Sequence, residues 1–237
     1  MRKTRILSLL VLLLAVICMC CACGKSNGKV YSDSAVKRYA KEQCPNENFK
    51  QISKEKISDN PTHYQHKFKT DRGLVFTVDN YLGEFDGFFF KRWRKELNCD
   101  YSKKIMDLYH DDARAVMSQY EKIESKNSWA YIDEYADIEP LVNQIMKAEK
   151  VFEPELKYND KEFLASLNCV YLHIVHFPSE EARLQHKNWT NITTIYINGG
   201  HSREEILTKI RDRYLKLVKN GEIKDDTVSS ELLDTVQ

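Results

Sequence analysis

Residues 63–78 read HYQHKFKTDRGLVFTV, and this stretch predicts a β-hairpin. His63–Lys69 alternates between apolar and polar side chains, and Leu74–Val78 is rich in β-branched and aromatic residues, as expected of two strands. Asp71-Arg72-Gly73 joins them, and glycine accepts the positive φ that a tight turn needs. Strands joined by such a turn run antiparallel, so we expect this part of the chain to form an antiparallel sheet.

Further elements are expected on both sides of the hairpin. Strands are predicted at 49–57 and 85–93, and a short helix at 34–43 ends before Pro45, which cannot continue it. After the strands the chain becomes helical, because apolar residues recur three and four positions apart over 102–123 and again over 138–152.

The last third of the chain returns to strands and ends in an amphipathic helix. Cys169–Phe177 (CVYLHIVHF) has the composition of an interior strand, and Ile192–Asn198 alternates. A helix then begins after Ser202, which has capping-box spacing to Glu205. It is expected to stop near Gly221, with residues 225–237 as a short last helix or a frayed tail.

The segregation of strands and helices predicts an α+β fold rather than a doubly wound parallel sheet. We expect small antiparallel sheets, a central helical segment and a C-terminal amphipathic helix. Residues 34–237 are expected to form the folded domain. A sub-boundary is predicted near 127–137, where an irregular connection contains Trp129, Tyr131 and Tyr135.

Residues 1–25, MRKTRILSLLVLLLAVICMCCACGK, have the pattern of an export signal. Arg2, Lys3 and Arg5 give a positive start, and Ile6–Ile17 is an apolar core of the length typical of signal peptides. Cys20-Cys21-Ala22-Cys23 follows, with a small residue before the last cysteine.

This segment resembles the lipobox signal of bacterial lipoproteins, in the form found in Gram-positive examples. The resemblance implies cleavage of residues 1–22, a diacylglycerol thioether on Cys23 and a lipidated tether over residues 23–33. Cys21 fits less well, because Cys20 precedes it. The implied location is the outer face of the cell membrane. The alternatives are cleavage without lipidation and a retained membrane anchor, although a transmembrane helix needs roughly 20 apolar residues.

The charge balance argues against nucleic acid as a partner. The whole chain has 36 Lys+Arg and 35 Asp+Glu, and loss of the three basic residues of the signal leaves a net charge near −2. Nucleic-acid-binding domains normally carry a clearly basic face.

Three cysteines remain if Cys23 carries lipid, namely Cys44, Cys99 and Cys169. An odd number does not suit a disulfide framework, although one bridge remains open. We expect isolated thiols that pack as small apolar side chains, rather than a catalytic thiol.

One candidate anion site lies at the start of the C-terminal helix. Gly199 and Gly200 form a turn just before Ser202 and Arg203. Such a turn exposes backbone N–H groups at a helix N-terminus, and the arginine could assist in holding an anion. The alternative is a turn that only starts the helix.

Other chemistry-bearing patterns have structural interpretations. The aromatic-basic run 88–95 (FFFKRWRK) suits either an interface with anionic lipid or wall polymer, or a strand with apolar residues in the core. The HxxH pairs His63/His66 and His173/His176 do not predict a metal site, because strand positions three apart point to opposite faces. We expect His110-Asp111-Asp112 on the solvated side of a helix.

The sequence therefore predicts a lipid-anchored extracytoplasmic lipoprotein that acts as a binding module. We expect no cofactor and no metal. The expected partners are the membrane, through the lipid, and an unknown protein or a cell-wall polymer. The alternatives are a cell-envelope enzyme, either a wall hydrolase or a folding helper, and an immunity-type protective lipoprotein. Trp93, Trp129, Trp189 and the many tyrosines could supply contact area to a partner, or they could equally belong to the core.

Overall fold

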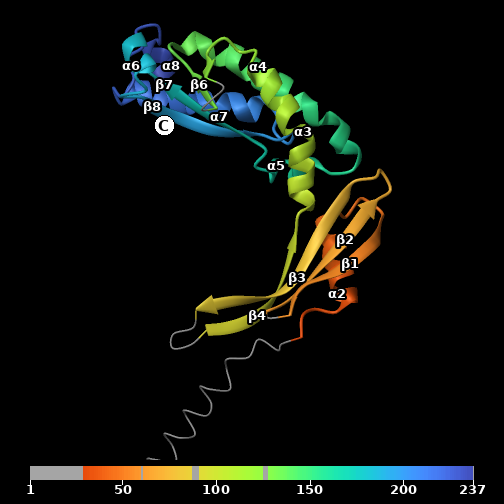
Figure 1. Cartoon of the computed structure of the whole chain (residues 1–237). Helices are drawn as coiled ribbons and strands as arrows, with labels where there is room; N and C mark the ends of the chain where they lie inside the picture. The colour runs from red at the N-terminus through yellow and green to blue at the C-terminus, as the bar shows by residue number, and fades with distance from the viewer. Residues whose placement is uncertain (1–28, 60, 87–90, 125–127, 237) are drawn as a thin grey trace, which may run out of the picture. The chain divides into compact units, whose positions relative to one another are not determined.

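The computed structural model describes residues 29–59, 61–86, 91–124 and 128–236 (Figure 1). The chain forms two compact units that divide between Lys104 and Ile105. The predicted α+β class is confirmed, because the chain contains both helices and antiparallel sheets. Residues 127–137, where a sub-boundary was expected, lie inside the second unit.

In the described residues of the first unit, a helix precedes a four-stranded antiparallel meander in the order β1-β2-β3-β4. Its elements are α2 (Asp33–Gln43), β1 (Phe49–Asp59), β2 (Thr62–Thr70), β3 (Val75–Asp86) and β4 (Lys91–Cys99). The single strand expected at 85–93 is instead the end of β3 and the start of β4. Side-chain alternation does not locate such a strand end, because both strands continue the same pattern.

The predicted hairpin is confirmed. Gly73 has a φ of 94°, and the N–H of Thr70 donates to the carbonyl of Leu74 at 2.9 Å. Arg72 in this turn pairs with Glu47 at 2.7 Å, and the hydroxyl of Tyr101 also donates to Glu47. Glu47 is only 5% exposed, and these two donors offset the desolvation cost of its buried carboxylate.

Aromatic rings on neighbouring strands form the core of the first unit. Phe68 and Phe76 face each other across β2 and β3 with their ring centroids 5.4 Å apart, and both contact Phe49 edge-on. Tyr101, the first residue of α3 (Tyr101–Met117), contacts Phe76 at 5.3 Å. Such contacts add about 0.5–1.5 kcal/mol per pair to the burial of the rings.

The second unit contains the rest of α3 and a second four-stranded sheet. Its strands are β5 (Ile123–Glu124), β6 (Trp129–Tyr131), β7 (Val170–His176) and β8 (Thr190–Ile197). Its helices after α3 are η1 (Tyr135–Asp137), α4 (Ile138–Glu149), η2 (Lys150–Lys157), α5 (Lys161–Ala165), α6 (Glu180–Leu184), α7 (Arg203–Lys219) and α8 (Ser230–Leu233).

The second sheet has the order β5-β6-β7-β8, and one of its pairs is parallel. β7 is an interior strand, as predicted. β6 lies within the connection that was expected to be irregular, and it pairs in parallel with β7 in the register Trp129↔His173. Three residues carry too little pattern to predict a strand, and β6 is defined by the partner that it pairs with.

Helices α4 and α7 pack against each other and against β8, on one face of this sheet (Figure 1). α7 begins as predicted: the Ser202 hydroxyl accepts from the N–H of Glu205, and the Glu205 carboxylate accepts from the N–H of Ser202. Its buried residues are Ile206, Ile210, Tyr214, Leu215 and Leu217. The chain turns away at Gly221, which has a φ of 74°.

Within the part of the chain that the structure describes, no helix is both long and apolar enough to span a bilayer.

Candidate functional site

The second sheet presents aromatic side chains on the face opposite to that covered by α4 and α7. Strand alternation directs Leu172 and Ile195 toward the helices, where both are buried. The strand neighbours of these two residues, such as Tyr171, His173 and Tyr196, point to the opposite face. We call this set the aromatic surface; it consists of Trp129, Tyr131, Tyr171, His173, Trp189 and Tyr196.

Trp129 is the centre of the aromatic surface. Its ring centroid lies 5.1 Å from that of Trp189, 6.3 Å from that of His173 and 6.1 Å from that of Phe177. Tyr171 extends the surface through contacts with His173 at 4.3 Å and with Tyr196 at 5.2 Å. The rings therefore form one connected surface across β6, β7 and β8.

The outer part of the aromatic surface is accessible to solvent. Trp189 is 41% exposed and Tyr171 is 40% exposed, and neighbouring Leu184 is 71% exposed. A ring that served only the core would be covered, and exposed aromatic residues of this kind are enriched at binding surfaces.

The loops that carry the aromatic surface contain backbone strain. Ser128, His186 and Asn188 have φ values of 53°, 51° and 55°, in the left-handed region that disfavours side chains. These are the positive-φ non-glycine residues in the described parts of the chain, and each lies within three residues of Trp129 or Trp189. Such a conformation costs roughly 1–2 kcal/mol for most L-residues and less for asparagine and histidine, which adopt it more readily. Backbone strain of this kind clusters at functional sites.

A cavity of about 420 Å³ adjoins the aromatic surface. Arg183 of α6 lies in its wall, with the guanidinium carbon 4.8 Å from the ring centre of Tyr131, and it donates to the Tyr131 hydroxyl at 3.0 Å. His186 pairs with Glu124 at 3.1 Å in the same wall. Polar and aromatic side chains thus both line this cavity.

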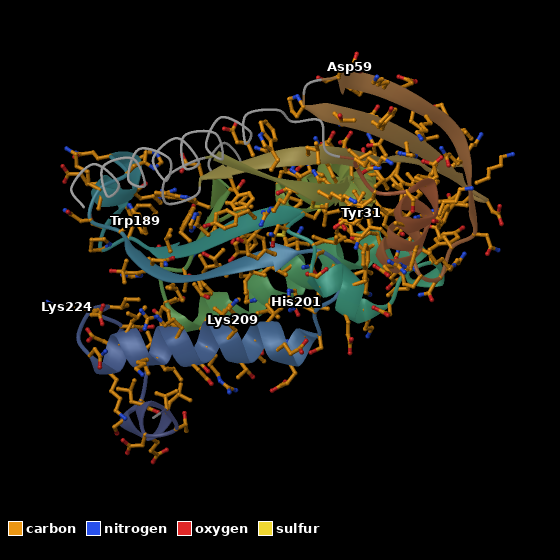
Figure 2. The ribbon with its side chains drawn as sticks, turned by 90° about the horizontal axis from the view of Figure 1, so that it is seen from below. Tyr31, Asp59, Trp189, His201, Lys209 and Lys224 are labelled. Carbon is orange, nitrogen blue, oxygen red and sulfur yellow. The ribbon has the colours of Figure 1, made fainter. Side chains whose placement is uncertain are left out.

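A second cavity, of about 960 Å³, shares Phe177 and Arg183 with the first. It is bounded by the loop before β8 and by the segment after α7; Figure 2 shows Trp189 and Lys224 at the same end of the unit. His176 lies in its wall. The Nδ1 atom of His176 is 2.9 Å from the carbonyl of Ile132, so Nδ1 carries the proton and Nε2 is an acceptor in the neutral ring.

The anion site predicted around the glycine turn holds a carboxylate of the chain itself. The N–H groups of Asn198 and Gly199 donate to the two carboxylate oxygens of Glu149, at 3.3 and 2.5 Å. His201 adds a third backbone N–H. The donors that an external anion would use are therefore already occupied.

The remaining members of the predicted anion site are also engaged. Gly200 donates its N–H to the side chain of Asn198, and Ser202 takes part in the helix cap. Arg203 forms an ion pair with Glu139. The alternative interpretation, a turn that starts the helix, describes this segment better.

Burial of Glu149 has an electrostatic consequence. The residue is 4% exposed, and desolvation raises the pKa of its carboxyl to about 7 in spite of three backbone N–H donors that lower it. His201 in the same turn is half-buried, and desolvation lowers its pKa. Glu149 thus titrates near neutral pH inside the fold, where it serves as a structural anchor between α4 and the turn before α7.

The basic side chains described within the aromatic-basic run have partners in the first unit. Arg94 pairs with Glu96 at 2.6 Å and lies over the ring of Phe85, and Lys95 lies over the ring of Tyr31. Phe88–Phe90 lie outside the described residues. The contacts of Arg94 and Lys95 within the unit agree with the interpretation of this run as a strand, rather than as an interface with anionic lipid or wall polymer.

The histidines of each HxxH pair have different surroundings. His63 pairs with Asp79 at 3.0 Å, whereas His66 is fully buried and its pKa is lowered by desolvation. His173 belongs to the aromatic surface and His176 to the larger cavity. Among the described residues, no three His, Cys, Asp or Glu side chains gather as metal ligands would. His110 lies on α3, half-exposed, and bonds to Asp111.

Cys44, Cys99 and Cys169 are free thiols. Desolvation raises the pKa of Cys44 and of Cys169 to about 12, and that of Cys99 to about 11. A thiol with so high a pKa is a poor nucleophile at neutral pH. Cys23, the predicted lipid attachment site, lies outside the described residues.

Sequence reasoning named Trp129 and Trp189 as possible contact residues but missed Arg183 and His186. Neither residue stands in a recognisable motif. Their association with Trp129 depends on the pairing of β6 with β7, more than 40 positions apart in sequence.

Comparisons of the chain with models of protein families, with curated proteins and with solved structures give no significant match.

Proposed function

We propose that the chain is an extracytoplasmic binding module that is held at the outer face of the cell membrane by a lipid on Cys23. The lipobox-like pattern of residues 1–25 supports the location. The observation that carries the binding role is the aromatic surface, which combines exposed rings, two adjoining cavities and strained supporting loops.

The location is tested by substituting the predicted lipid attachment site. Cys23→Ala is expected to release the protein from the membrane fraction or to leave an uncleaved precursor, because no thioether can form at alanine. Cys21→Ala is the matched control, and it should leave processing unchanged. If mass spectrometry shows that the Cys23→Ala protein is still cleaved and lipidated, the assignment of Cys23 as the lipid attachment site is wrong.

The binding role is tested by photo-crosslinking on intact cells of the host. A benzophenone amino acid replaces Leu184, which is exposed beside the aromatic surface, or Leu156, which is exposed on η2 and serves as the control. We expect an adduct from position 184 that is absent from position 156 and is lost with Trp189→Ala. Absence of a specific adduct at position 184 would contradict the proposal.

An acid–base enzyme of the cell envelope is the second candidate, and His176 is the observation that favours it. Its Nε2 has no hydrogen-bond partner among the described residues, and its ring lies in the wall of the larger cavity. Incubation of the full chain with purified cell wall separates the two functions. Release of soluble fragments by the wild type but not by His176→Gln would favour the enzyme.

A further inference from the structure

The wall of the 420 Å³ cavity indicates which class of ligand the aromatic surface takes. Its volume lies within the range of about 300–1,000 Å³ that is typical of small-ligand sites. Its lining includes the aromatic residues Trp129, Tyr131 and Phe177. The polar residues of the lining are Glu121, Glu124, Arg183 and His186.

Charges of both signs are present in this wall, on the carboxylates of Glu121 and Glu124 and on the guanidinium of Arg183. His186 is paired with Glu124, and Arg183 is paired with Glu180 at 3.4 Å as well as bonded to Tyr131. A cationic ligand would meet the guanidinium, which already covers the face of Tyr131. An anionic ligand would meet the carboxylate of Glu121. A neutral ligand would meet neither of these repulsions.

A neutral ligand for this wall needs an apolar face and several groups that both donate and accept hydrogen bonds. The C–H face of a pyranose ring can stack on an indole, because an aromatic ring presents a large apolar face. Sugar hydroxyls can donate to carboxylates and accept from guanidinium or imidazole N–H groups. An aliphatic peptide side chain would form no hydrogen bonds with these polar groups.

The arrangement extends beyond a single sugar ring. Trp189 lies next to Trp129 and is exposed, and the 960 Å³ cavity continues from the shared residues Phe177 and Arg183. We infer that the aromatic surface binds a neutral oligosaccharide, which stacks on Trp129 and Trp189 while its hydroxyl groups bond to Glu124, Arg183 and His186. This inference rests on the proposed binding function and specifies its ligand.

Isothermal titration of the full chain in a polyoxyethylene detergent tests the ligand class. The probes are the neutral tetrasaccharides chitotetraose, cellotetraose and maltotetraose, with tetra-alanine and choline as competing classes. We expect at least one tetrasaccharide to bind and Trp189→Ala to weaken that binding at least tenfold, with partial recovery in Trp189→Phe. Leu156→Ala, a change on η2, should bind as the wild type does.

Each other outcome contradicts the inference in a distinguishable way. If no tetrasaccharide binds up to about 10 mM while the photo-crosslink at position 184 persists, the sugar class is wrong and the binding function stands. If neither tetrasaccharide binding nor the photo-crosslink is observed, both the sugar class and the binding function are wrong. Binding of tetra-alanine or choline in place of the sugars identifies another ligand class. Tetrasaccharide binding that is unchanged in Trp189→Ala places the sugar elsewhere on the protein. Trp189 is partly exposed, and circular dichroism of the variant checks that it folds.

Discussion

At the scale of single residues, Glu149 shows how a fold can occupy a site that its sequence offers to a ligand. The turn at Gly199 presents backbone N–H groups in the manner of an anion site, and a carboxylate 50 positions earlier accepts them. Burial then raises the pKa of that carboxyl to about 7. The turn therefore contributes to stability rather than to recognition, and its contribution depends on pH.

Glu149→Gln is expected to flatten the pH dependence of stability. The pKa of Glu149 in the folded state is raised above 4.5, so the folded state holds its proton more tightly and stability falls as pH rises from about 4.5 to 7. A shift to about 7 corresponds to about 3 kcal/mol, at 1.36 kcal/mol per pKa unit. Urea unfolding of wild type and variant at pH values below and above this window measures the difference. Glu153→Gln, at an exposed position, should keep the wild-type slope, and an unchanged slope in Glu149→Gln would refute the prediction.

Gly199→Ala is expected to be more destabilising than Gly221→Ala. Both glycines have positive φ, at 84° and 74°, but a Cβ at Gly199 would collide with the side chain of Phe152, whereas a Cβ at Gly221 meets nothing within 4 Å. Strain alone costs about 1 kcal/mol, and overpacking adds about 1–3 kcal/mol. Denaturant midpoints of the two variants give the comparison, and equal midpoints would contradict it.

At the scale of elements, the loops around the second sheet differ from the helices that cover its other face. β6 has only three residues, and the loop from α6 to β8 holds two residues with positive φ. α7, in contrast, has a capping box, a buried stripe and a glycine stop that agree with one another. The aromatic surface is thus carried by short elements and loops on a sheet whose other face is covered by longer helices, an arrangement common at binding sites.

Ser202→Ala is expected to destabilise the second unit by about 1 kcal/mol, because it removes the side-chain acceptor for the N–H of Glu205 at the start of α7. Arg213→Ala, at an exposed position inside the same helix, should change stability by less than about 0.5 kcal/mol. Thermal unfolding of the two variants provides the measurement. A larger effect in Arg213→Ala would show that the cap is not what stabilises this helix.

At the scale of the whole molecule, the chain contains two units with separate cores. Phe68, Phe76 and Tyr101 form the core of the first unit, and Leu141 and Ile174 belong to the core of the second. Among the residues that the structure describes, each unit has its own four-stranded sheet. Two units of this kind can unfold in separate steps, so one melting temperature does not have to describe the chain.

Core truncations are expected to act mainly within their own unit. Phe76→Ala should destabilise the first unit by about 3–5 kcal/mol, and Leu141→Ala the second by about 2–5 kcal/mol. Hydrogen exchange followed by mass spectrometry would detect a loss of protection in residues 29–104 for the first variant and in residues 105–236 for the second. A loss of protection throughout the chain in both variants would show that the units unfold together.

The features that the sequence determined by itself are local. The Asp71-Arg72-Gly73 turn, the cap formed by Ser202 and Glu205 and the interior strand at Cys169–Phe177 all follow from spacing and residue type within a few positions, because turns, caps and amphipathic faces depend on near neighbours. The pattern at residues 1–25 is local in the same sense, and the membrane location that it predicts is tested by Cys23→Ala.

Only the tertiary structure decided what meets across long distances in sequence. It brought Glu149 to the glycine turn and paired β6 with β7. It also gathered Trp129, Arg183 and His186 around one cavity and placed Trp189 against Trp129. No local spacing encodes these contacts. The free energy that selects them comes from burying whole faces of a sheet and its helices together, which involves residues from the entire unit.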